Sequence, residues 1–191
     1  MGVRGLIGYA FCGSFCTHER SLRALSELIA EGIEVQPIMS TVAYTTSTRF
    51  GKSEDLVRRV EELTGKRVIH TVEDAEPLGP KNPLDALIIA PCTGNTLAKL
   101  ALGITDTAVT MAAKAHLRQD RPLLIALASN DAVSQNLKSI GMLYTRRSVY
   151  FVPLSQDDPE RKPYSLVAEM ERIPEASRAM RAGIQLRPLF T

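Results

Sequence analysis

Short apolar runs alternate with amphipathic segments along the whole chain. The apolar runs that predict strands are rich in β-branched residues and cover 3–11, 33–39, 67–70, 85–90, 122–128 and 148–153. The runs at 85–90 and 122–128 contain almost no polar residue, which is typical of parallel strands covered on both faces. Pro37 interrupts the second run and predicts a bulge or a position near the sheet edge.

Amphipathic segments lie between these runs and predict helices at 21–32, 53–65, 95–102, 107–118 and 165–183. In the first of them, apolar residues recur at helical spacing and Gly32 stands where a C-terminal cap belongs. We expect the last helix to be kinked or broken at Pro174. The segment 73–83 holds three prolines and a glycine and predicts an irregular loop.

This order of elements predicts an α/β fold, a doubly wound (Rossmann-like) parallel sheet in a three-layer sandwich, formed as a single domain over 1–191. Such sheets bind ligands at the carboxyl ends of their strands, where the winding direction switches. The loops that follow residues 11, 39, 90 and 128 are therefore the candidates for a binding site.

The loop after the first strand reads FCGSFCTHE. Gly13 permits a tight turn, and Ser14 adds a hydroxyl where the free N–H groups of the next helix begin, which favours a phosphate. The dinucleotide fingerprint is absent, and no lysine follows Gly13 as in an ATP-hydrolysing loop. A plain strand-to-helix turn, capped by Ser14 or Thr17, explains this stretch equally well.

The loop after the second strand, STVAYTTSTRFG (40–51), carries seven hydroxyl side chains among twelve residues. Hydrogen bonding to a polar ligand would use that density, and so would an ordinary surface loop. Arg49 is the cation of this loop, and its planar guanidinium suits a carboxylate or a phosphate. A surface ion pair is the simpler interpretation of Arg49.

The loop after residue 90 follows a buried strand with an unusual number of small polar groups, in PCTGNT. We expect Pro91 to stop the strand pairing, Gly94 to allow close backbone approach, and Asn95 or Thr96 to cap the next helix. Ser129 and Asn130 stand at the same place after the following strand. Together these loops predict a site for a large flat or phosphorylated molecule.

Composition narrows the class of protein. The chain has 191 residues, a net charge of +2 and 45% hydrophobic residues, a profile typical of a globular protein. No basic run predicts a nucleic-acid surface, and no apolar run approaches the ~18 residues of a membrane span. The three cysteines predict neither a disulfide framework nor a metal site, so we expect a cytoplasmic protein.

The sequence contains few titratable side chains that are candidates for a catalytic role. We expect His18 to be exposed in the first turn of its helix and His116 to be solvated at a helix end. Cys16 lies near a helix N-terminus and could be reactive, although the sequence offers it no evident histidine partner. Asp157 and Asp158 are explained most simply by turn formation.

Three pieces of the sequence resemble a known family: the Gly-Ser turn at 13–14, PCTGNTLAK at 91–99 and LGITD at 102–106. They are similar to the flavoproteins related to phosphopantothenoylcysteine decarboxylase, and the resemblance covers nearly the whole chain. In that family the Gly-Ser turn holds the FMN phosphate, and a Pro-x-x-x-Asn-Thr loop approaches the flavin ring. The residues that the resemblance implies for FMN binding are Gly13, Ser14, Phe15, Ser40, Pro91, Thr93, Gly94, Asn95, Thr96, Ser129 and Asn130.

Further pieces resemble one branch of this family, found in spore-forming bacteria. They are TTSTRFG (45–51), AEPLGPKNPLD (75–85), APCTGNTLAK (90–99), MAAKAHLR (111–118) and FVPLSQDDPERKPYSLVA (151–168). This resemblance implies an oxidoreductase subunit, active in the mother cell with a separate A subunit that binds NADP or NAD. Together they would oxidise dihydrodipicolinate to pyridine-2,6-dicarboxylate. A homo-oligomer, trimeric or larger, is expected by resemblance.

A dicarboxylate substrate would give Arg49, Asn95 and Lys162 a binding role, and Asn95 and Arg49 are the candidates for catalysis. Two alternatives stay open. The chain could be a non-catalytic assembly protein with a vestigial flavin pocket, or a phosphopantothenoylcysteine decarboxylase-like enzyme. The decarboxylases carry a catalytic histidine at about the place of Pro77, and a Pro-x-Met-Asn motif where this chain has LASNDAVSQN. Because both elements are missing here, the decarboxylase activity is disfavoured.

Overall fold

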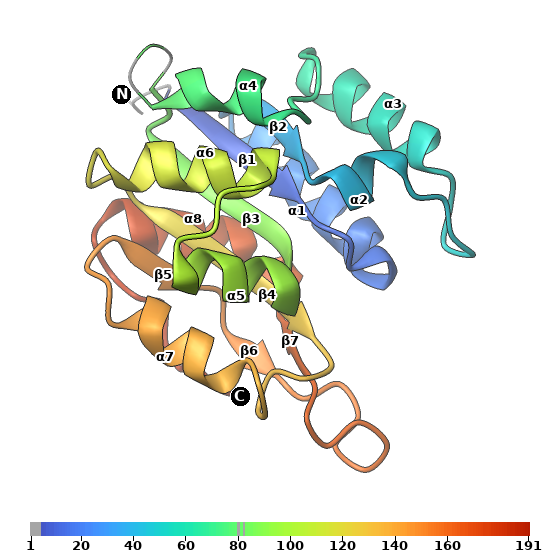
Figure 1. Ribbon diagram of the computed structural model, residues 1–191, viewed down its shortest axis with the longest axis vertical. Coiled ribbons are helices and arrows are strands. Elements are labelled where there is room, and N and C mark those ends of the chain that lie inside the picture. Colours follow the sequence, from blue (N-terminus) through green and yellow to red (C-terminus); the bar gives the residue numbers. More distant parts are fainter. Residues whose placement is uncertain (1–4, 80, 82) are drawn as a thin grey trace.

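Figure 1 shows the computed structural model of the chain, which describes residues 5–79, 81 and 83–191. The first two positions of the strand expected over 3–11, and positions 80 and 82 of the expected loop, lie outside the described residues. Within them, one sheet of seven strands has the order β2-β1-β3-β4-β7-β6, with β5 also paired to β4. The strands are β1 (Leu6–Phe11), β2 (Glu34–Met39), β3 (Ala86–Thr93), β4 (Leu123–Ser129), β5 (Val149–Phe151), β6 (Leu154–Ser155) and β7 (Leu166–Ala168).

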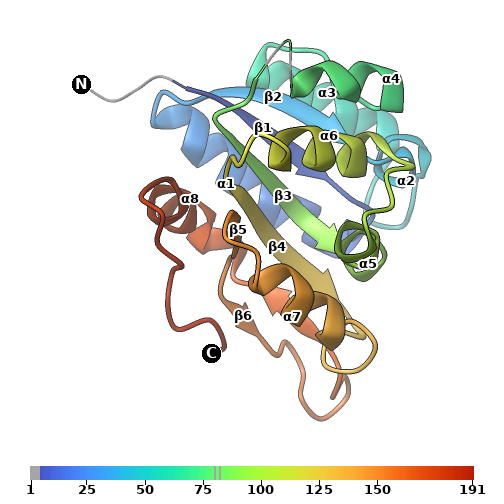
Figure 2. The ribbon, with the colours of Figure 1, turned by 60° about the vertical axis from the view of Figure 1, so that its left-hand side comes forward.

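Helices cover both faces of the sheet. Figure 2 shows α1 and α8 on one face, and α5, α6 and α7 on the other. The α-helices are α1 (His18–Ala30), α2 (Thr41–Thr45), α3 (Ser53–Thr64), α4 (Val72–Ala75), α5 (Gly94–Leu102), α6 (Ala108–Leu117), α7 (Leu137–Tyr144) and α8 (Ile173–Arg181). Short 3-10 helices cover Phe15–Thr17, Glu76–Leu78 and Met170–Arg172. The expected three-layer α/β sandwich is confirmed.

The central strands owe their place to continuous apolar sequence. Every residue of β3 from Ala86 to Cys92 is buried, as is β4 from Leu123 to Ala128, since helices cover both faces. β1, β2, β3, β4 and β5 pair in parallel. β6 and β7 add an antiparallel hairpin at the far edge, which the expectation of a parallel sheet did not include.

Polar contacts inside the core fix α1 on the sheet. The buried hydroxyl of Tyr9 in β1 lies 2.9 Å from the Ser21 hydroxyl oxygen of α1. Ser21 donates in turn to the backbone carbonyl of Ala90 in β3 at 2.6 Å. This chain of hydrogen bonds holds α1 against the end of β3, where the polar loop begins.

Several expected boundaries were wrong. Pro91 interrupts the strand pairing but does not end the strand: pairing to β1 stops at Ile89, and pairing to β4 resumes at Cys92 after a register shift and continues to Thr93. The segment 67–70 forms a single bridge, through Ile69, instead of a strand. The segment 73–83, expected to be irregular, begins with the short helix α4 and a 3-10 turn.

The end of the chain also differs from the helix expected over 165–183. Residues Leu166–Ala168 form β7, and the α-helix begins only at Ile173. Pro174 stands in the first turn of α8 and starts the helix, where its missing N–H costs nothing.

Both outer sides of the sheet are covered by other parts of the chain. Beside β2, the backbone N–H of Met39 donates to the carbonyl of Ile69 at 2.8 Å. Beside β5, the Gln185 side chain accepts from the Phe151 N–H at 2.9 Å and donates to its carbonyl at 2.7 Å. The last residues continue this cover, since the Leu154 N–H donates to the Leu189 carbonyl at 2.8 Å.

Candidate functional site

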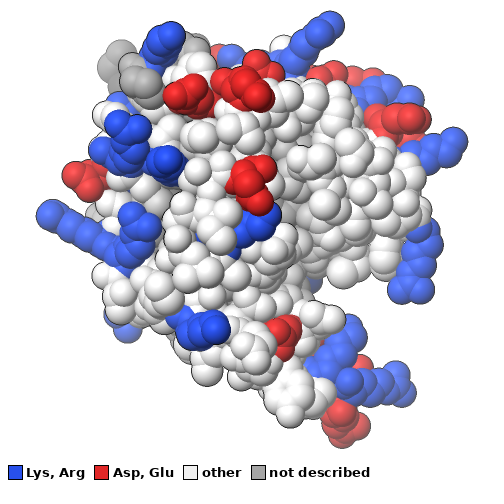
Figure 3. Space-filling model, in the orientation of Figure 1, with Lys and Arg blue, Asp and Glu red and all other residues white. Residues whose placement is uncertain are grey.

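A cleft of about 710 Å³ lies at the carboxyl ends of β1, β3 and β4. The loops 46–52 and 156–165 reach out on either side of it, and Figure 3 shows the hollow between them with Lys and Arg side chains at its borders. The cleft is lined by Gly13, Ser14, Phe15, Cys16, Thr17, Phe50, Thr93, Gly94, Asn95, Ala128, Ser129, Asn130, Asp131, Asn136, Asp157, Lys162, Ser165 and Val167.

Sequence reasoning placed eight of the eleven expected cofactor residues at this cleft and missed part of its wall. The residues of the wall that it did not propose as ligand contacts include Cys16, Phe50, Asp131, Asn136, Asp157 and Ser165. Most of them come from loops whose approach depends on tertiary folding. Phe50 could have been found from the sequence, because it is a large aromatic side chain inside the hydroxyl-rich loop.

Ser14 stands at the start of the helical stretch that leads into α1, with its hydroxyl uncommitted. Neither Ser14 nor Thr17 makes a side-chain cap, so the alternative of a simple capped turn is wrong in this respect. The Thr17 hydroxyl instead donates to the Ser14 carbonyl at 2.8 Å. The Ser14 hydroxyl is therefore available to a ligand at a helix start, where an anion is favoured.

The two glycines of the cleft wall are required by close packing. A Cβ on Gly13 would lie 2.9 Å from Val42 Cγ1 of α2. A Cβ on Gly94 would lie 2.5 Å from Asn136 Nδ2 and 2.6 Å from the Ser129 hydroxyl oxygen. Gly94 thus allows close approach, as expected, and the groups that approach it are two polar side chains of the cleft.

The polar residues after β3 divide into supporting and free groups. Thr93 caps α5 by accepting from the Thr96 N–H at 3.2 Å, so the cap is neither Asn95 nor Thr96. The Thr96 hydroxyl is buried and donates to Cys12 Sγ at 3.4 Å. Asn95 is exposed at the cleft, and its amide forms no hydrogen bond among the described residues. Asn95 is therefore the residue of this loop with a free amide for a ligand.

The loop after β4 is organised by Ser129. Its hydroxyl accepts from the Asp131 N–H at 3.2 Å and from Asn136 Nδ2 at 3.5 Å. Asn130 is exposed beside it and lines the same cleft. Ser129 thus shapes the loop, while Asn130 keeps its amide toward solvent.

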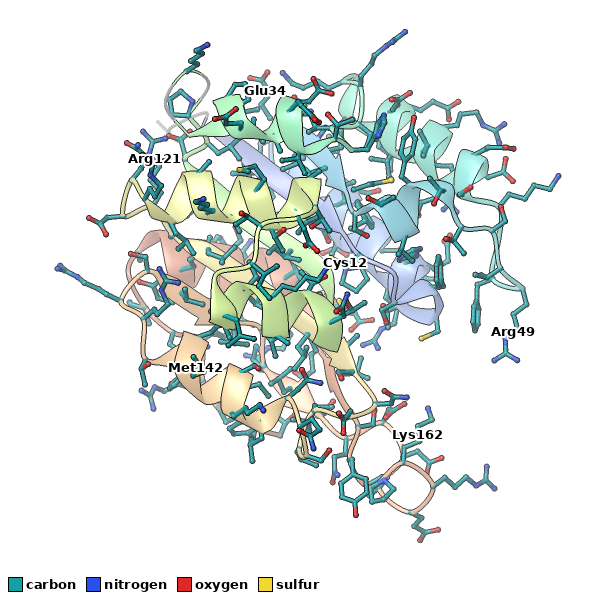
Figure 4. All side chains as sticks on the ribbon, in the orientation of Figure 1. Cys12, Glu34, Arg49, Arg121, Met142 and Lys162 are labelled. Carbon is teal, nitrogen blue, oxygen red and sulfur yellow. The ribbon has the colours of Figure 1, made fainter. Side chains whose placement is uncertain are left out.

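Four expected ligand residues lie elsewhere. Ser40 caps α2 by accepting from the Ala43 N–H, and Thr96 points to Cys12 as described above. Pro91 is buried inside β3, where its carbonyl accepts from the Cys12 N–H at 3.1 Å. Arg49 stands at the tip of its loop, over the ring of Phe50 at 4.9 Å, and does not line the cleft. Figure 4 shows its guanidinium pointing away from the protein body.

Lys162 lines the cleft but is already paired. Figure 4 shows Lys162 on the loop 156–165, which borders the cleft. Its Nζ lies 2.6 Å from Asp157 Oδ2. This hydrogen bond lowers the pKa of Asp157 and raises the pKa of Lys162. Because Asp157 and Asp131 both line the cleft, its wall carries no excess of positive charge.

Both histidines expected to be exposed are buried. His18 is 9% exposed and donates from Nε2 to the Cys12 carbonyl at 2.7 Å, and His116 is fully buried with Nε2 2.9 Å from the Pro122 carbonyl. Burial lowers the pKa of both imidazoles. Burial also raises the pKa of Cys12 to about 11, so this thiol stays protonated at neutral pH.

Metal ligands and membrane-spanning helices are not found in the described part of the chain. Among those residues, no group of three or more histidine, cysteine, aspartate or glutamate side chains could hold a metal ion. In the same residues, no helix has both the length and the apolar character that crossing a bilayer requires. Pro77, near the expected place of the decarboxylase histidine, lies in the 3-10 turn after α4 and outside the cleft wall.

Comparison with known proteins identifies the family. Residues 4–174 match the family described as Flavoprotein. The B subunit of dipicolinate synthase from Bacillus subtilis (strain 168) is 42% identical over 184 residues, which cover 96% of this chain and 92% of that relative.

Two solved structures extend the comparison. The B subunit of dipicolinate synthase from Bacillus halodurans C superposes with a TM-score of 0.90 at 37% identity, covering 98% of this chain and 96% of that one. A dodecameric FMN-dependent UbiX-like decarboxylase from Escherichia coli O157:H7 has a TM-score of 0.65 at 22% identity, over 78% of this chain and 79% of that one, and shows the shared fold alone. The chain therefore belongs to the Flavoprotein family, in the branch that contains the B subunit of dipicolinate synthase.

Proposed function

We propose that the cleft binds FMN and that the chain acts with the A subunit of dipicolinate synthase to oxidise dihydrodipicolinate to pyridine-2,6-dicarboxylate. The observation that carries the proposal is the pair of free ligand-binding groups in one cleft, the Ser14 hydroxyl and the Asn95 amide. The relative that is 42% identical is named for this synthase, and the family for flavin binding.

The cleft suits FMN in size and in its donors. Its volume of about 710 Å³ lies within the ~300–1,000 Å³ typical of cofactor pockets. Ser14, with the backbone of Gly13 and Phe15, would hold the phosphate at the start of the helical stretch. Thr93, Gly94 and Asn95 on one side, and Ser129 and Asn130 on the other, would lie along the flavin ring. Ser40, Pro91 and Thr96 would support that wall from behind.

Bound flavin would supply a two-electron acceptor beside the substrate. The reaction removes a hydride equivalent and a proton from the dihydropyridine ring, and NADP or NAD on the A subunit would be the final acceptor of the two electrons. In this chain, Asn95 would orient the ligand of the cleft through its free amide. Lys162 could attract a carboxylate only by exchanging its bond to Asp157. Arg49 would reach substrate only if its loop closes over the cleft.

The same proposal covers the partner and assembly. A chain similar to the B subunit is expected to require the A subunit for activity. A homo-oligomer, trimeric or larger, is proposed because a protein of the same fold is dodecameric. Action in the cytoplasm of the mother cell follows from the reaction, whose product belongs to spores.

The first test is the absorption spectrum of the purified chain, with and without added FMN. We expect flavin absorbance to shift on binding, with a weaker complex for Ser14→Ala and Asn95→Ala. If the purified chain neither carries flavin nor binds added FMN in titration, the proposal that the cleft binds FMN is refuted. Co-purification with the A subunit and conversion of dihydrodipicolinate by the pair, followed by nicotinamide reduction, tests the reaction.

A non-catalytic assembly role is the second candidate. The observation in its favour is that no histidine lines the cleft in the part of the chain that the structure describes. This candidate requires that the pair keeps full activity after Ser14→Ala and Asn95→Ala. A large loss of activity with normal assembly contradicts it. The decarboxylase alternative predicts carbon dioxide release from a cysteine substrate, which a direct assay measures.

A further inference from the structure

A small pocket adjoins the cleft between the start of α1, the 46–53 loop and α3. We call it the side pocket. Its volume is about 140 Å³, and it shares Phe15, Cys16 and Phe50 with the cleft wall. It is lined by Phe15, Cys16, His18, Glu19, Leu22, Ala43, Thr46, Thr48, Phe50, Gly51, Lys52, Ser53, Asp55, Leu56 and Arg59. The side pocket thus accounts for part of the hydroxyl-rich loop, which the proposed function left without a role.

The size of the side pocket selects a small ligand. Its volume is below the ~300 Å³ at which pockets for drug-sized ligands begin, and well above the ~10–15 Å³ that one water needs. Its wall combines apolar side chains, such as Leu22 and Leu56, with the hydroxyls of Thr46 and Thr48. A single planar ring with polar substituents matches this wall and volume better than a nucleotide does.

One cation of the side pocket is available to a carboxylate. Glu19 is paired with Arg59 at 2.6 Å, and Asp55 with Arg58 at 2.9 Å. Lys52 has no ion pair among the described residues. The wall carries two acidic and two basic side chains and so has no net charge, and within the described residues Lys52 is its cation without an ion pair, free to meet a ligand carboxylate.

His18 supplies the base that the cleft lacks. A carbonyl can only accept, so the bond to Cys12 fixes the proton of the neutral ring on Nε2. Nδ1 then carries a lone pair and forms no hydrogen bond with the described residues. The rings of Phe11 and Phe15, at centroid distances of 6.0 and 5.3 Å, hold the imidazole in place.

We propose that the side pocket holds the dicarboxylate ring and that His18 accepts its proton during oxidation. This inference rests on the proposed function. The hydride leaves a ring carbon with its electron pair, and the oxidised nicotinamide nucleotide of the A subunit is the final acceptor of these two electrons. The proton leaves the neighbouring ring atom for Nδ1, and the electrons of that bond become the new ring double bond. The proton then passes to water.

The surroundings of His18 agree with a base that is neutral at pH 7. Burial lowers its pKa, although the bond to Cys12 and the charge of Glu19 act in the opposite direction. The other titratable or charged groups around it are Cys12 after β1, Cys16 before α1, Lys52 and Asp55 at the start of α3, and Arg59. The Glu19–Arg59 pair limits the net field of these groups at the ring.

The catalytic test uses two matched substitutions. His18→Gln keeps a donor at the place of Nε2 and removes the base, and His116→Gln makes the same change at a buried histidine remote from both pockets. In the complex with the A subunit, we expect kcat/KM to fall about 100-fold or more for His18→Gln and to be unchanged for His116→Gln. The acidic limb of the pH profile should disappear with His18→Gln. If His18→Gln leaves the rate and the pH profile unchanged, the role of His18 as the base is refuted.

Ligand binding is measured separately from turnover. Calorimetry with pyridine-2,6-dicarboxylate should show binding to the FMN-treated chain, weakened about tenfold by Lys52→Gln and unaffected by Lys138→Gln. Nitrogen-15 spectra of the three histidines should show a shift of His18 with this probe and none of His116. If the dicarboxylate does not bind, or binds without shifting the nitrogen-15 signals of His18, the proposal that the side pocket holds the substrate is refuted. If the wild-type pair oxidises nothing, the proposed function fails, while binding still decides the side pocket.

Discussion

His18 on α1 donates from Nε2 to the carbonyl oxygen of Cys12, at 2.7 Å, directly after β1. The bond joins the first strand to the first long helix at the turn that carries Ser14. The same carbonyl also accepts from the Ser14 N–H at 2.9 Å, so His18 is the second donor to it and is buried with this turn. Neutral His18 is therefore part of the folded structure.

The first prediction concerns stability in acid. Burial lowers the pKa of His18 and His116 in the folded chain, so the unfolded chain binds more protons between the folded value and the ordinary ~6.5. We expect the free energy of unfolding to fall as the pH decreases through that range, and to level off below the folded pKa values. Urea titrations at several pH values measure it. The double variant with glutamine at both positions should show a flatter curve, and an equal slope would contradict this origin.

The second prediction concerns the hydrogen bond from Ser21 to Ala90. Ser21→Ala removes the donor from a fully buried carbonyl, and we expect a loss of about 1–3 kcal/mol in unfolding free energy. Ser26→Ala is the control, because Ser26 lies on the same helix and bonds only within it, to the Leu22 carbonyl. Chemical denaturation measures both. Because alanine has a higher helix propensity than serine, we expect Ser26→Ala to lose little stability, and equal losses in the two variants would contradict the role of the link to β3.

The third prediction concerns Gly94. In Gly94→Ala the new methyl group would meet Asn136 and Ser129 at 2.5 and 2.6 Å, so both side chains must move from the cleft wall. We expect FMN affinity to fall by about tenfold with a stability change of only ~1 kcal/mol, since flexible side chains can give way. Gly141→Ala, in α7 with nothing within 4 Å of the new Cβ, should keep FMN binding and gain up to ~1 kcal/mol. Unchanged FMN affinity in Gly94→Ala would refute the role of this wall.

The fourth prediction concerns the Lys162–Asp157 pair. Asp157→Asn removes one of the two carboxylates of the cleft wall and frees Lys162 from its ion pair, so we expect FMN to bind a few-fold more tightly, most clearly at low salt. Glu160→Gln, in the same loop but outside the cleft wall, is the control. In the unsubstituted chain the pKa of Asp157 is lowered, so its carboxylate stays charged and neutralises Lys162 until the pH falls through this lowered pKa. Fluorescence titration of FMN measures each case, and weaker binding in Asp157→Asn would contradict the charge argument.

The layer order and the cleft could be predicted because they depend on local patterns. Continuous apolar sequence marked β3 and β4, and Gly13, Ser14 and Asn95 follow strands whose carboxyl ends share one edge. Both features can be predicted from the spacing of hydrophobic residues along the chain and from the known topology of parallel sheets.

The remaining features depend on contacts between distant segments. The burial of His18 requires the Cys12 carbonyl, and the extension of β3 past Pro91 requires pairing with β4 across a register shift. The hairpin of β6 and β7 has two and three residues per strand, too few for a periodic signal. The side pocket forms only where α1 and α3 meet, which no single stretch of sequence records.

The cover provided by Ile69 at one edge and by Gln185 at the other has a consequence for self-association. Main-chain groups that would recruit a strand from another molecule are already engaged at Met39, Phe151 and Leu154. Because unpaired edges are the usual templates for intermolecular β-pairing, the fold removes a common route to aggregation. Copies of this chain are therefore expected to meet through their helices and loops, without extending the sheet from one molecule into the next.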